Sequence, residues 1–175
     1  ACNKFTSLVL GSSLEKIGNS VFKDCMKITG EVIIPQSIKS IGNYAFSGCS
    51  EVLCFTFDNG SVLSSIGEYA FEMCQALTYI ELPNSVATIG EGAFADCVSL
   101  KYFVLGVDIN SSTAITTIPE NMFINDASLE FILFHESVTI IEDNAFASCF
   151  NNGAGLYDVV FTGSSEKMDT IIANM

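Results

Sequence analysis

The side chains with the greatest chemical potential in this chain are its seven cysteines and its single histidine, His135. A thiolate beside an imidazole can act as a catalytic nucleophile, two thiols can form a disulfide, and cysteine with histidine can bind zinc. The spacing of the cysteines along the chain decides between these uses.

The cysteines belong to an internal repeat. The segment IGEGAFADC, residues 89–97, has five relatives in the chain, and the copies are separated by 24, 25, 23, 29 and 23 residues. A period of about 23 residues is typical of a solenoid, in which each coil buries its apolar face against its neighbours. The copies begin at Ile17, Ile41, Ile66, Ile89, Ile118 and Ile141.

A second segment follows each nonamer and alternates apolar with other residues, which predicts a β-strand. One strand per coil, all running in the same direction, gives a parallel sheet. The expected strands centre on residues 8–10, 32–34, 55–57, 80–82, 103–105, 132–134 and 159–161.

Two further positions of the nonamer have a predicted structural role. The glycine of each Ile-Gly pair is expected to allow a backbone conformation that a side chain would resist. The phenylalanines recur at one position, so we expect them to stack as a row inside the solenoid: Phe22, Phe46, Phe71, Phe94, Phe123 and Phe146.

The repeat also predicts the role of the cysteines. Six of them share one repeat position and should point into the core as small apolar residues, side by side rather than facing, which suits neither a disulfide nor a zinc site. Cys54 alone falls at an outward position, exposed or partly covered. His135 takes a turn position, away from the buried row, so we expect no catalytic residue. The six are Cys2, Cys25, Cys49, Cys74, Cys97 and Cys149.

Charge and hydropathy exclude several classes of partner. The net charge of −13 disfavours nucleic acid and anionic lipid, and no apolar run reaches the roughly 20 residues that span a bilayer. Asp108, Asn110 and Asp126 could gather near one edge, but no calcium loop or phosphate loop is present. We therefore expect no metal and no cofactor.

The outward side chains of the sheet are the best candidates for binding. On neighbouring coils they include three aromatic and two aliphatic residues beside one carboxylate, and an exposed patch of this kind usually marks an interaction site. The alternative is that a sheet simply tolerates β-forming residues, or that flanking repeats cover them. We call these residues the sheet patch: Tyr79, Glu81, Tyr102, Val104, Phe131 and Leu133.

The segment LTYIELPNSVATIGEGAFADC, residues 77–97, resembles the repeat of the BspA-like, Treponema-type leucine-rich repeat proteins. The resemblance implies a curved leucine-rich repeat solenoid with its parallel sheet on the concave face, and with turns and short helical segments elsewhere. The fifth copy departs from the pattern, with Pro119, Met122 and Asp126 in place of Gly, Ala and Cys.

Domain boundaries follow from the same pattern. We expect about seven coils over residues 1–163, the first of them truncated, and a C-terminal cap over residues 164–175 in which Met168, Ile171 and Ile172 cover the open end. Because the chain begins inside a repeat, we expect the parent protein to continue upstream.

The resemblance implies a non-enzymatic binding module, secreted or on the cell surface, whose concave sheet recognises a protein or glycan on a host or neighbouring cell. The alternative is an intracellular, cytoplasmic scaffold or assembly subunit that uses the same surface for a permanent protein contact. A reducing compartment would suit cysteines that form no disulfide.

Overall fold

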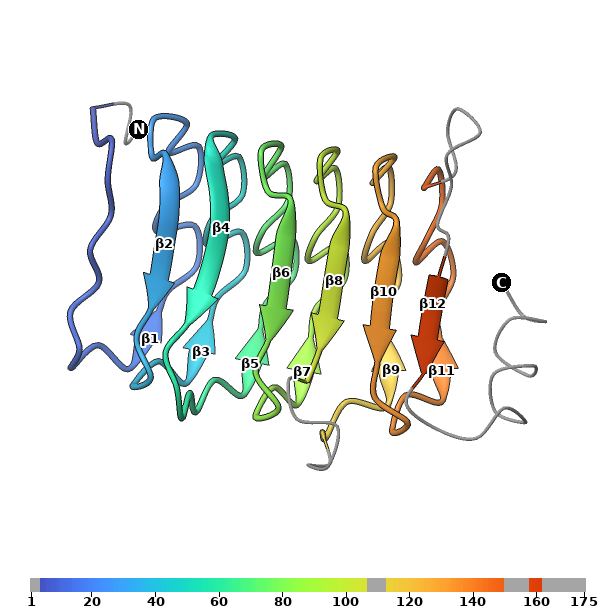
Figure 1. Cartoon of the computed structure of the whole chain (residues 1–175). Coiled ribbons are helices and arrows are strands. Elements are labelled where there is room, and N and C mark those ends of the chain that lie inside the picture. The colour runs from blue at the N-terminus through green and yellow to red at the C-terminus, as the bar shows by residue number, and fades with distance from the viewer. Residues whose placement is uncertain (1–3, 107–112, 150–157, 162–175) are drawn as a thin grey trace.

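The computed structural model describes residues 4–106, 113–149 and 158–161. The chain winds into a solenoid in which long and short strands alternate, and the long strands lie side by side along one wall (Figure 1). The long strands are β2 (Gly30–Ile34), β4 (Val52–Phe57), β6 (Tyr79–Leu82), β8 (Tyr102–Leu105), β10 (Phe131–Phe134) and β12 (Asp158–Phe161). The short strands are β1 (Lys16–Ile17), β3 (Ser40–Ile41), β5 (Ser65–Ile66), β7 (Thr88–Ile89), β9 (Thr117–Ile118) and β11 (Ile140–Ile141).

The long strands form a parallel sheet in the order β12-β10-β8-β6-β4-β2, as predicted. The expected strand at residues 8–10 is wrong: this segment is not part of the described sheet. It keeps the expected alternation, because Leu8 and Leu10 pack on the core while Val9 is 92% exposed. The predicted cap over residues 164–175 lies outside the described residues.

The expected short helical segments are also wrong for the described residues, where each nonamer forms consecutive turns instead. Two residues in each nonamer have positive φ, such as Tyr69 at 52° and Met73 at 56°. Two left-handed residues four positions apart in the turn cannot belong to an α-helix. The turn therefore sends alternate N–H groups out of its own coil.

Those N–H groups bond to the next coil. The amides of Tyr69, Phe71 and Met73 donate to the carbonyls of Glu91, Ala93 and Ala95 at 2.8–2.9 Å. The same pattern recurs between other neighbouring coils, so the turn wall is hydrogen-bonded from coil to coil much as the sheet is. This satisfies backbone groups that would otherwise be buried without a partner.

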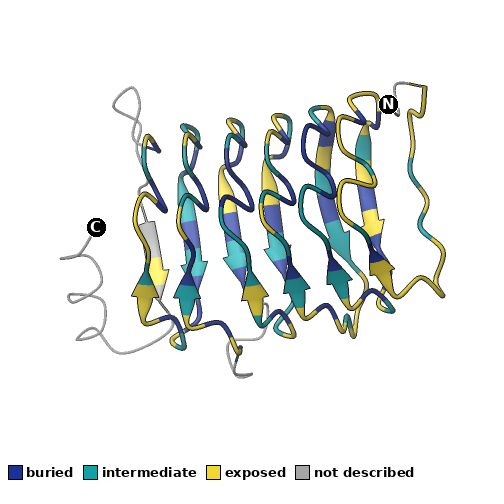
Figure 2. Ribbon diagram, turned by 180° about the vertical axis from the view of Figure 1, so that it is seen from behind, coloured by how far each residue is buried: buried dark blue, intermediate teal, exposed yellow. Residues whose placement is uncertain are grey.

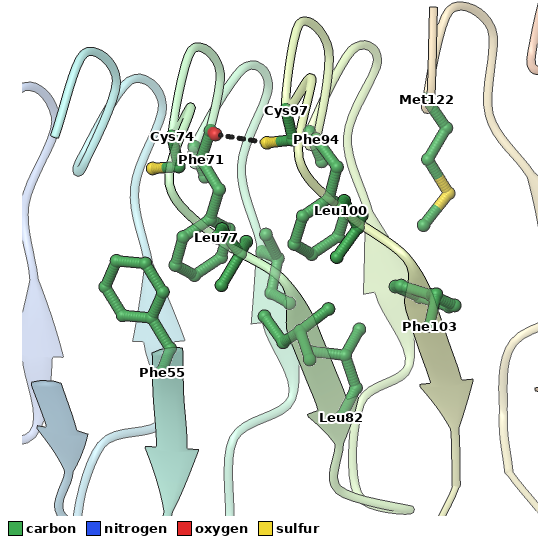
Figure 3. Packing of buried hydrophobic residues seen from close by; sticks show 14 of the residues in the cluster. Phe55, Phe71, Cys74, Leu77, Leu82, Phe94, Cys97, Leu100, Phe103 and Met122 are labelled. Atoms are coloured by element: carbon green, nitrogen blue, oxygen red, sulfur yellow. Dashed lines mark hydrogen bonds between the residues drawn. The ribbon is translucent and has the colours of Figure 1, made fainter. Parts of the chain in front are cut away.

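Phenylalanine fills the space between the two walls, and the predicted row is confirmed. Ring centroids of successive members from Phe22 to Phe146 are 5.2–6.0 Å apart, with nearly parallel planes. Phe103, from the sheet, meets Phe94 and Phe123 edge-on. Figure 3 shows the phenylalanines and leucines of adjacent coils packed in register.

The repeated glycines serve a different purpose from the one predicted. Gly42, Gly67 and Gly90 are absent from the residues with positive φ. A Cβ at each would nevertheless lie 2.4 Å from an atom of the preceding coil, with backbone carbon or nitrogen atoms among its nearest contacts. The preceding coil therefore leaves no room for a side chain at these positions. Gly18, in the first described nonamer, would meet only a Val21 methyl group at 3.4 Å.

Pro119 interrupts the wall of short strands. In neighbouring coils the residue after the short strand donates its N–H to the coil before, as Gly90 does to Ile66 at 2.9 Å. Pro119 has no N–H to donate. The short strands accordingly form two sheets, β1-β3-β5-β7 and β11-β9, which are separated at this point.

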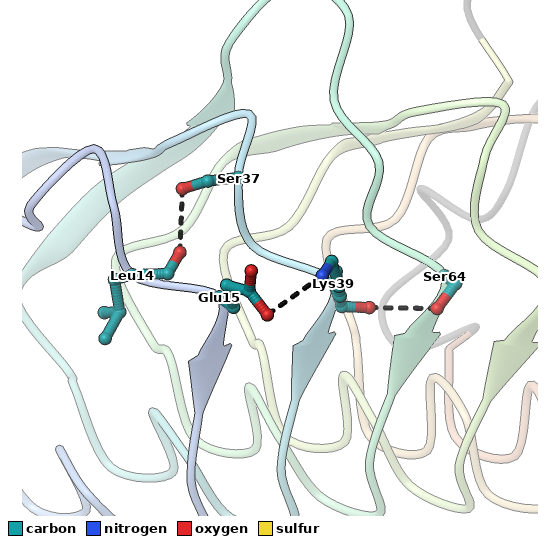
Figure 4. A network of polar contacts seen from close by, with 5 residues as sticks. All are labelled: Leu14, Glu15, Ser37, Lys39 and Ser64. Carbon is teal, nitrogen blue, oxygen red and sulfur yellow. Dashed lines mark hydrogen bonds and ion pairs between the residues drawn. The ribbon is translucent and has the colours of Figure 1, made fainter.

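Polar contacts join the turns at the surface. Ser37 donates to the carbonyl of Leu14, Lys39 pairs with Glu15 at 2.9 Å, and Ser64 donates to the carbonyl of Lys39 (Figure 4). The ion pair is well exposed and contributes little to stability. Burial alternates along the long strands (Figure 2), so the solenoid is held mainly by its apolar interior and its backbone bonds.

The close approach of the coils predicts a position-dependent glycine effect. Gly67→Ala should lower the free energy of unfolding by about 1–3 kcal/mol, as overpacking does, because the new methyl group meets the Asn43 and Gly42 backbone. Gly18→Ala is the matched control and should change stability by less than about 0.5 kcal/mol. Thermal unfolding of the two variants checks this, and equal losses would contradict the steric explanation.

Candidate functional site

The cysteines at the repeat position form a buried ladder, as predicted for the members that the structure describes. Each of four thiols donates to the carbonyl of a phenylalanine in an earlier coil; the bond from Cys97 to Phe71 is 3.1 Å long (Figure 3). No disulfide links the described cysteines. Burial raises the pKa of Cys74 and Cys97 well above the ordinary thiol value, which keeps them protonated and poorly nucleophilic.

The two remaining candidates for thiol chemistry lie far apart, Cys54 in β4 and His135 after β10, three strands away in the sheet. Cys54 is half-buried on the outer face of the sheet, where burial first and Glu31 second raise its pKa. His135 is buried in the turn after β10, and its Nδ1 accepts the N–H of Ser137 at 3.1 Å. The imidazole is thus held by its own turn rather than by a thiol.

Asp126 replaces cysteine in the ladder and is fully buried, so it is not among the solvated acidic residues of the surface. Its Oδ1 accepts the N–H of Cys97 at 2.8 Å, and its Oδ2 is buried without a hydrogen-bond partner. Burial raises the pKa of this carboxyl well above its ordinary value. Asp108 and Asn110 lie outside the described residues.

The structure brings all six residues of the sheet patch together in two rows across β6, β8 and β10. One row pairs Tyr79 with Tyr102 and Tyr102 with Phe131. The other row joins the remaining three members in the same register, and continues onto β12 at Val160. Tyr79 is 39% exposed and Tyr102 43% exposed, so the aromatic row faces solvent.

Carboxylates border the aromatic row. The Tyr79 hydroxyl donates to Glu81, and burial together with this bond raises the pKa of Tyr79 to about 12. The Tyr102 hydroxyl donates to Glu130 at 3.1 Å, and Lys101 pairs with the other oxygen of Glu130 at 2.7 Å. Both tyrosine rings are therefore positioned by carboxylates on the same face.

A cavity of about 630 Å³ adjoins the sheet patch at the carboxyl ends of β4 and β6, which the sequence reasoning missed. Two signals marked it: the loop after β4 is two residues longer than the loop after β6, and a proline follows β6. Tyr79 and Glu81 belong to both the cavity and the patch. The other lining residues are Phe55, Thr56, Phe57, Asp58, Asn59, Gly60, Ser61, Pro83, Asn84 and Ser85.

The described residues bring together no group of three or more potential metal ligands among His, Cys, Asp and Glu. Within the same part of the chain, no helix has the length and hydropathy needed to cross a bilayer. The features that remain are a regular solenoid, a sheet face with exposed aromatic side chains, and a neighbouring cavity.

Coils of this length, each with one long strand in a shared parallel sheet and with a buried aromatic and aliphatic row, define a leucine-rich repeat solenoid. The sequence pattern of the BspA type leucine rich repeat region matches residues 1–111 in six copies, so the chain belongs to this family. Leucine-rich repeats are generally a non-enzymatic protein-interaction fold. No curated protein matches the chain significantly.

Solved structures of bacterial repeat proteins share the fold. A leucine-rich repeat protein from Bacteroides ovatus is 32% identical, with a TM-score of 0.73 over 85% of this chain and 36% of its own. The pneumococcal vaccine antigen PcpA is 25% identical, with a TM-score of 0.63 over 82% of this chain and 36% of its own. A leucine rich cell surface protein from Faecalibacterium prausnitzii is 24% identical, with a TM-score of 0.61 over 91% of this chain and 47% of its own. The chain thus spans about a third to a half of the length of these proteins.

The buried Asp126 predicts an unusual dependence of stability on pH. Its folded pKa lies above its unfolded pKa, so folding retains a proton and the stability of the wild type falls as pH rises from the unfolded value toward the folded one. Asp126→Asn cannot ionise. Above about pH 4, the difference in free energy of unfolding between this variant and the wild type should shift in favour of the variant by up to about 1.4 kcal/mol per pH unit.

Chemical denaturation at a series of pH values checks this expectation. Asp143→Asn is the matched control because Asp143 is exposed in the next coil, and its profile should run parallel to that of the wild type. Parallel profiles for Asp126→Asn and the wild type would instead mean that Asp126 is ionised in the core.

Proposed function

We propose that this chain is a non-enzymatic binding module of a secreted or cell-surface protein, and that the sheet patch contacts a protein partner on a host or neighbouring cell. The observation that carries the proposal is the register of β6, β8 and β10. It places Tyr79, Tyr102 and Phe131 in one row on the outer face of the sheet.

The composition of the patch favours a protein partner over a glycan. Val104 and Leu133 lie in the row beside the aromatic side chains, and aliphatic contacts of this kind suit apolar side chains of another protein better than sugar hydroxyls. Tyrosine provides a large rigid surface with one polar atom, which is why it is frequent among residues that dominate binding energy. Bonds from Tyr79 to Glu81 and from Tyr102 to Glu130 hold the rings in place before binding.

The location of the parent protein is supported by similarity alone. The family consists of leucine-rich repeats, and one structural neighbour is a leucine rich cell surface protein. A surface module and an intracellular scaffold would use the same face, but the scaffold would keep its partner through purification, whereas a surface module would exchange it.

Replacing two aromatic residues tests the proposal. Tyr102→Ser with Phe131→Ser should abolish detectable binding to those members of a panel of purified extracellular matrix proteins that the wild type binds. Loss of an aromatic residue that dominates binding costs about 2 kcal/mol or more, so the loss of two should lower the affinity by about 1,000-fold. Biolayer interferometry with immobilised partner proteins measures the change.

The control variant removes exposed apolar side chains elsewhere. Val21→Ser with Met26→Ser acts on exposed residues in the turn region and should leave affinity unchanged. Binding that survives the patch substitutions, in protein that unfolds at the wild-type temperature, would overturn the proposed binding face. Selective retention of purified glycans by the wild type would replace the protein partner with a sugar.

A further inference from the structure

The cavity beside the sheet patch arises where β4 and β6 part. These strands pair only at Cys54 with Tyr79 and at Phe55 with Ile80. β6 and β8, by contrast, pair along the whole of β6 from Tyr79 to Leu82. The separation begins after the second pair, toward the carboxyl ends of β4 and β6, where the cavity lies.

A proline explains the separation. In two other coils the residue after the long strand donates its N–H to the strand before: Asp58 donates to Ile34 and Gly106 to Leu82, both at 3.1 Å. Pro83 occupies this position after β6 and has no N–H, so it cannot donate to the carbonyl of Phe57. Phe57 is one of the residues that line the cavity, and its carbonyl lacks the backbone donor that Asp58 and Gly106 supply at the equivalent position.

The charged side chains of the cavity are both acceptors, whereas its neutral polar side chains, hydroxyls and amides, can donate as well as accept. Asp58 and Glu81 contribute carboxylates, and none of the twelve lining residues is basic. Glu81 uses Oε2 to hold the Tyr79 hydroxyl, which leaves Oε1 for a ligand. A ligand that matches this wall must bring several N–H donors and a positive charge, because burying carboxylates beside a neutral apolar group would be unfavourable.

We propose that this cavity binds the guanidinium group of an arginine side chain on a protein partner, as an anchor at the end of the sheet patch; the inference rests on the proposed function. A guanidinium is planar, always charged and carries five donors in a fixed arrangement, which suits two carboxylates and a carbonyl. The aromatic ring of Tyr79 offers a cation-π surface at the rim.

Size and overall charge agree with this ligand. A cavity of about 630 Å³ is within the usual range of 300–1,000 Å³ for ligand sites and admits a long side chain with water. The chain carries a net charge of −13, which attracts a cationic partner segment from a distance. Tyr79 and Glu81 then connect the anchor directly to the aromatic row.

Short capped peptides test the inference on the whole chain. The probes are acetyl-Gly-Arg-Gly-amide and its citrulline analogue, which keeps the shape of arginine but lacks the charge. In an NMR titration, the arginine peptide should give saturable shifts in the amides of β4, β6 and the loop at residues 58–61. The citrulline peptide should bind at least about tenfold more weakly than the arginine peptide, since it loses charge-assisted hydrogen bonds.

Isosteric variants locate the charge effect. Asp58→Asn with Glu81→Gln should weaken arginine binding by about tenfold or more. Glu51→Gln removes one carboxylate charge from an exposed residue just before β4, at the opposite end of that strand, and should change arginine binding by less than about twofold. If the double variant Asp58→Asn with Glu81→Gln weakened arginine binding no more than Glu51→Gln does, or if arginine and citrulline bound equally, the anchor site would be overturned.

Two further experiments distinguish a failure of this inference from a failure of the proposed function. N-acetylglucosamine and galactose serve as sugar probes, and saturable shifts from them with none from arginine would assign the cavity to a glycan instead. Tyr102→Ser with Phe131→Ser alters the patch outside the cavity and should leave binding of the short arginine peptide intact. If that variant loses its protein partner while arginine and citrulline bind alike, the proposed function stands and the anchor fails.

Discussion

The close backbone stacking of the coils is the constraint on which the rest of this structure depends. Hydrogen bonds run from coil to coil on the sheet wall and on the turn wall, as from Phe71 to Ala93 at 2.8 Å. This spacing leaves no room for a Cβ at Gly42, Gly67 and Gly90. It also brings identical side chains into contact, so residues with flat faces or small volume suit the interior, which explains the phenylalanine row and the cysteine ladder beside it.

Interruptions in this stacking are as informative as its regularity. Each of two prolines removes one donor, and each removal has a local consequence. Pro119 divides the wall of short strands in two, whereas Pro83 parts β4 from β6 and opens a cavity on the outer face. Asp126 is an interruption of another kind, because it puts an ionisable group into the cysteine ladder. A solenoid tolerates these changes because each coil depends mainly on its immediate neighbours.

The sequence repeat predicted the structural features that all coils share. The parallel sheet, the phenylalanine row, the burial of the cysteine ladder and the pairing of Tyr79 with Tyr102 all follow from counting residues from one copy to the next. The turns were mistaken for helical segments because residues such as Tyr69 carry positive φ without being glycine, so composition gave no warning. The burial of Asp126 was missed because its charge was weighed above its repeat position, and the cavity was missed because it depends on a bond that Pro83 cannot make.

The inner and outer faces of the sheet therefore carry different kinds of information. Inward positions repeat nearly the same residue from coil to coil, since stacking admits few alternatives. The outward row passes from Glu31 through Cys54 to Tyr79, Tyr102 and Phe131, so no packing rule of the solenoid fixes these side chains. Because the fold does not fix the outward side chains, they are free to specify a partner. They depart most from the repeat where the aromatic row meets the gap between β4 and β6.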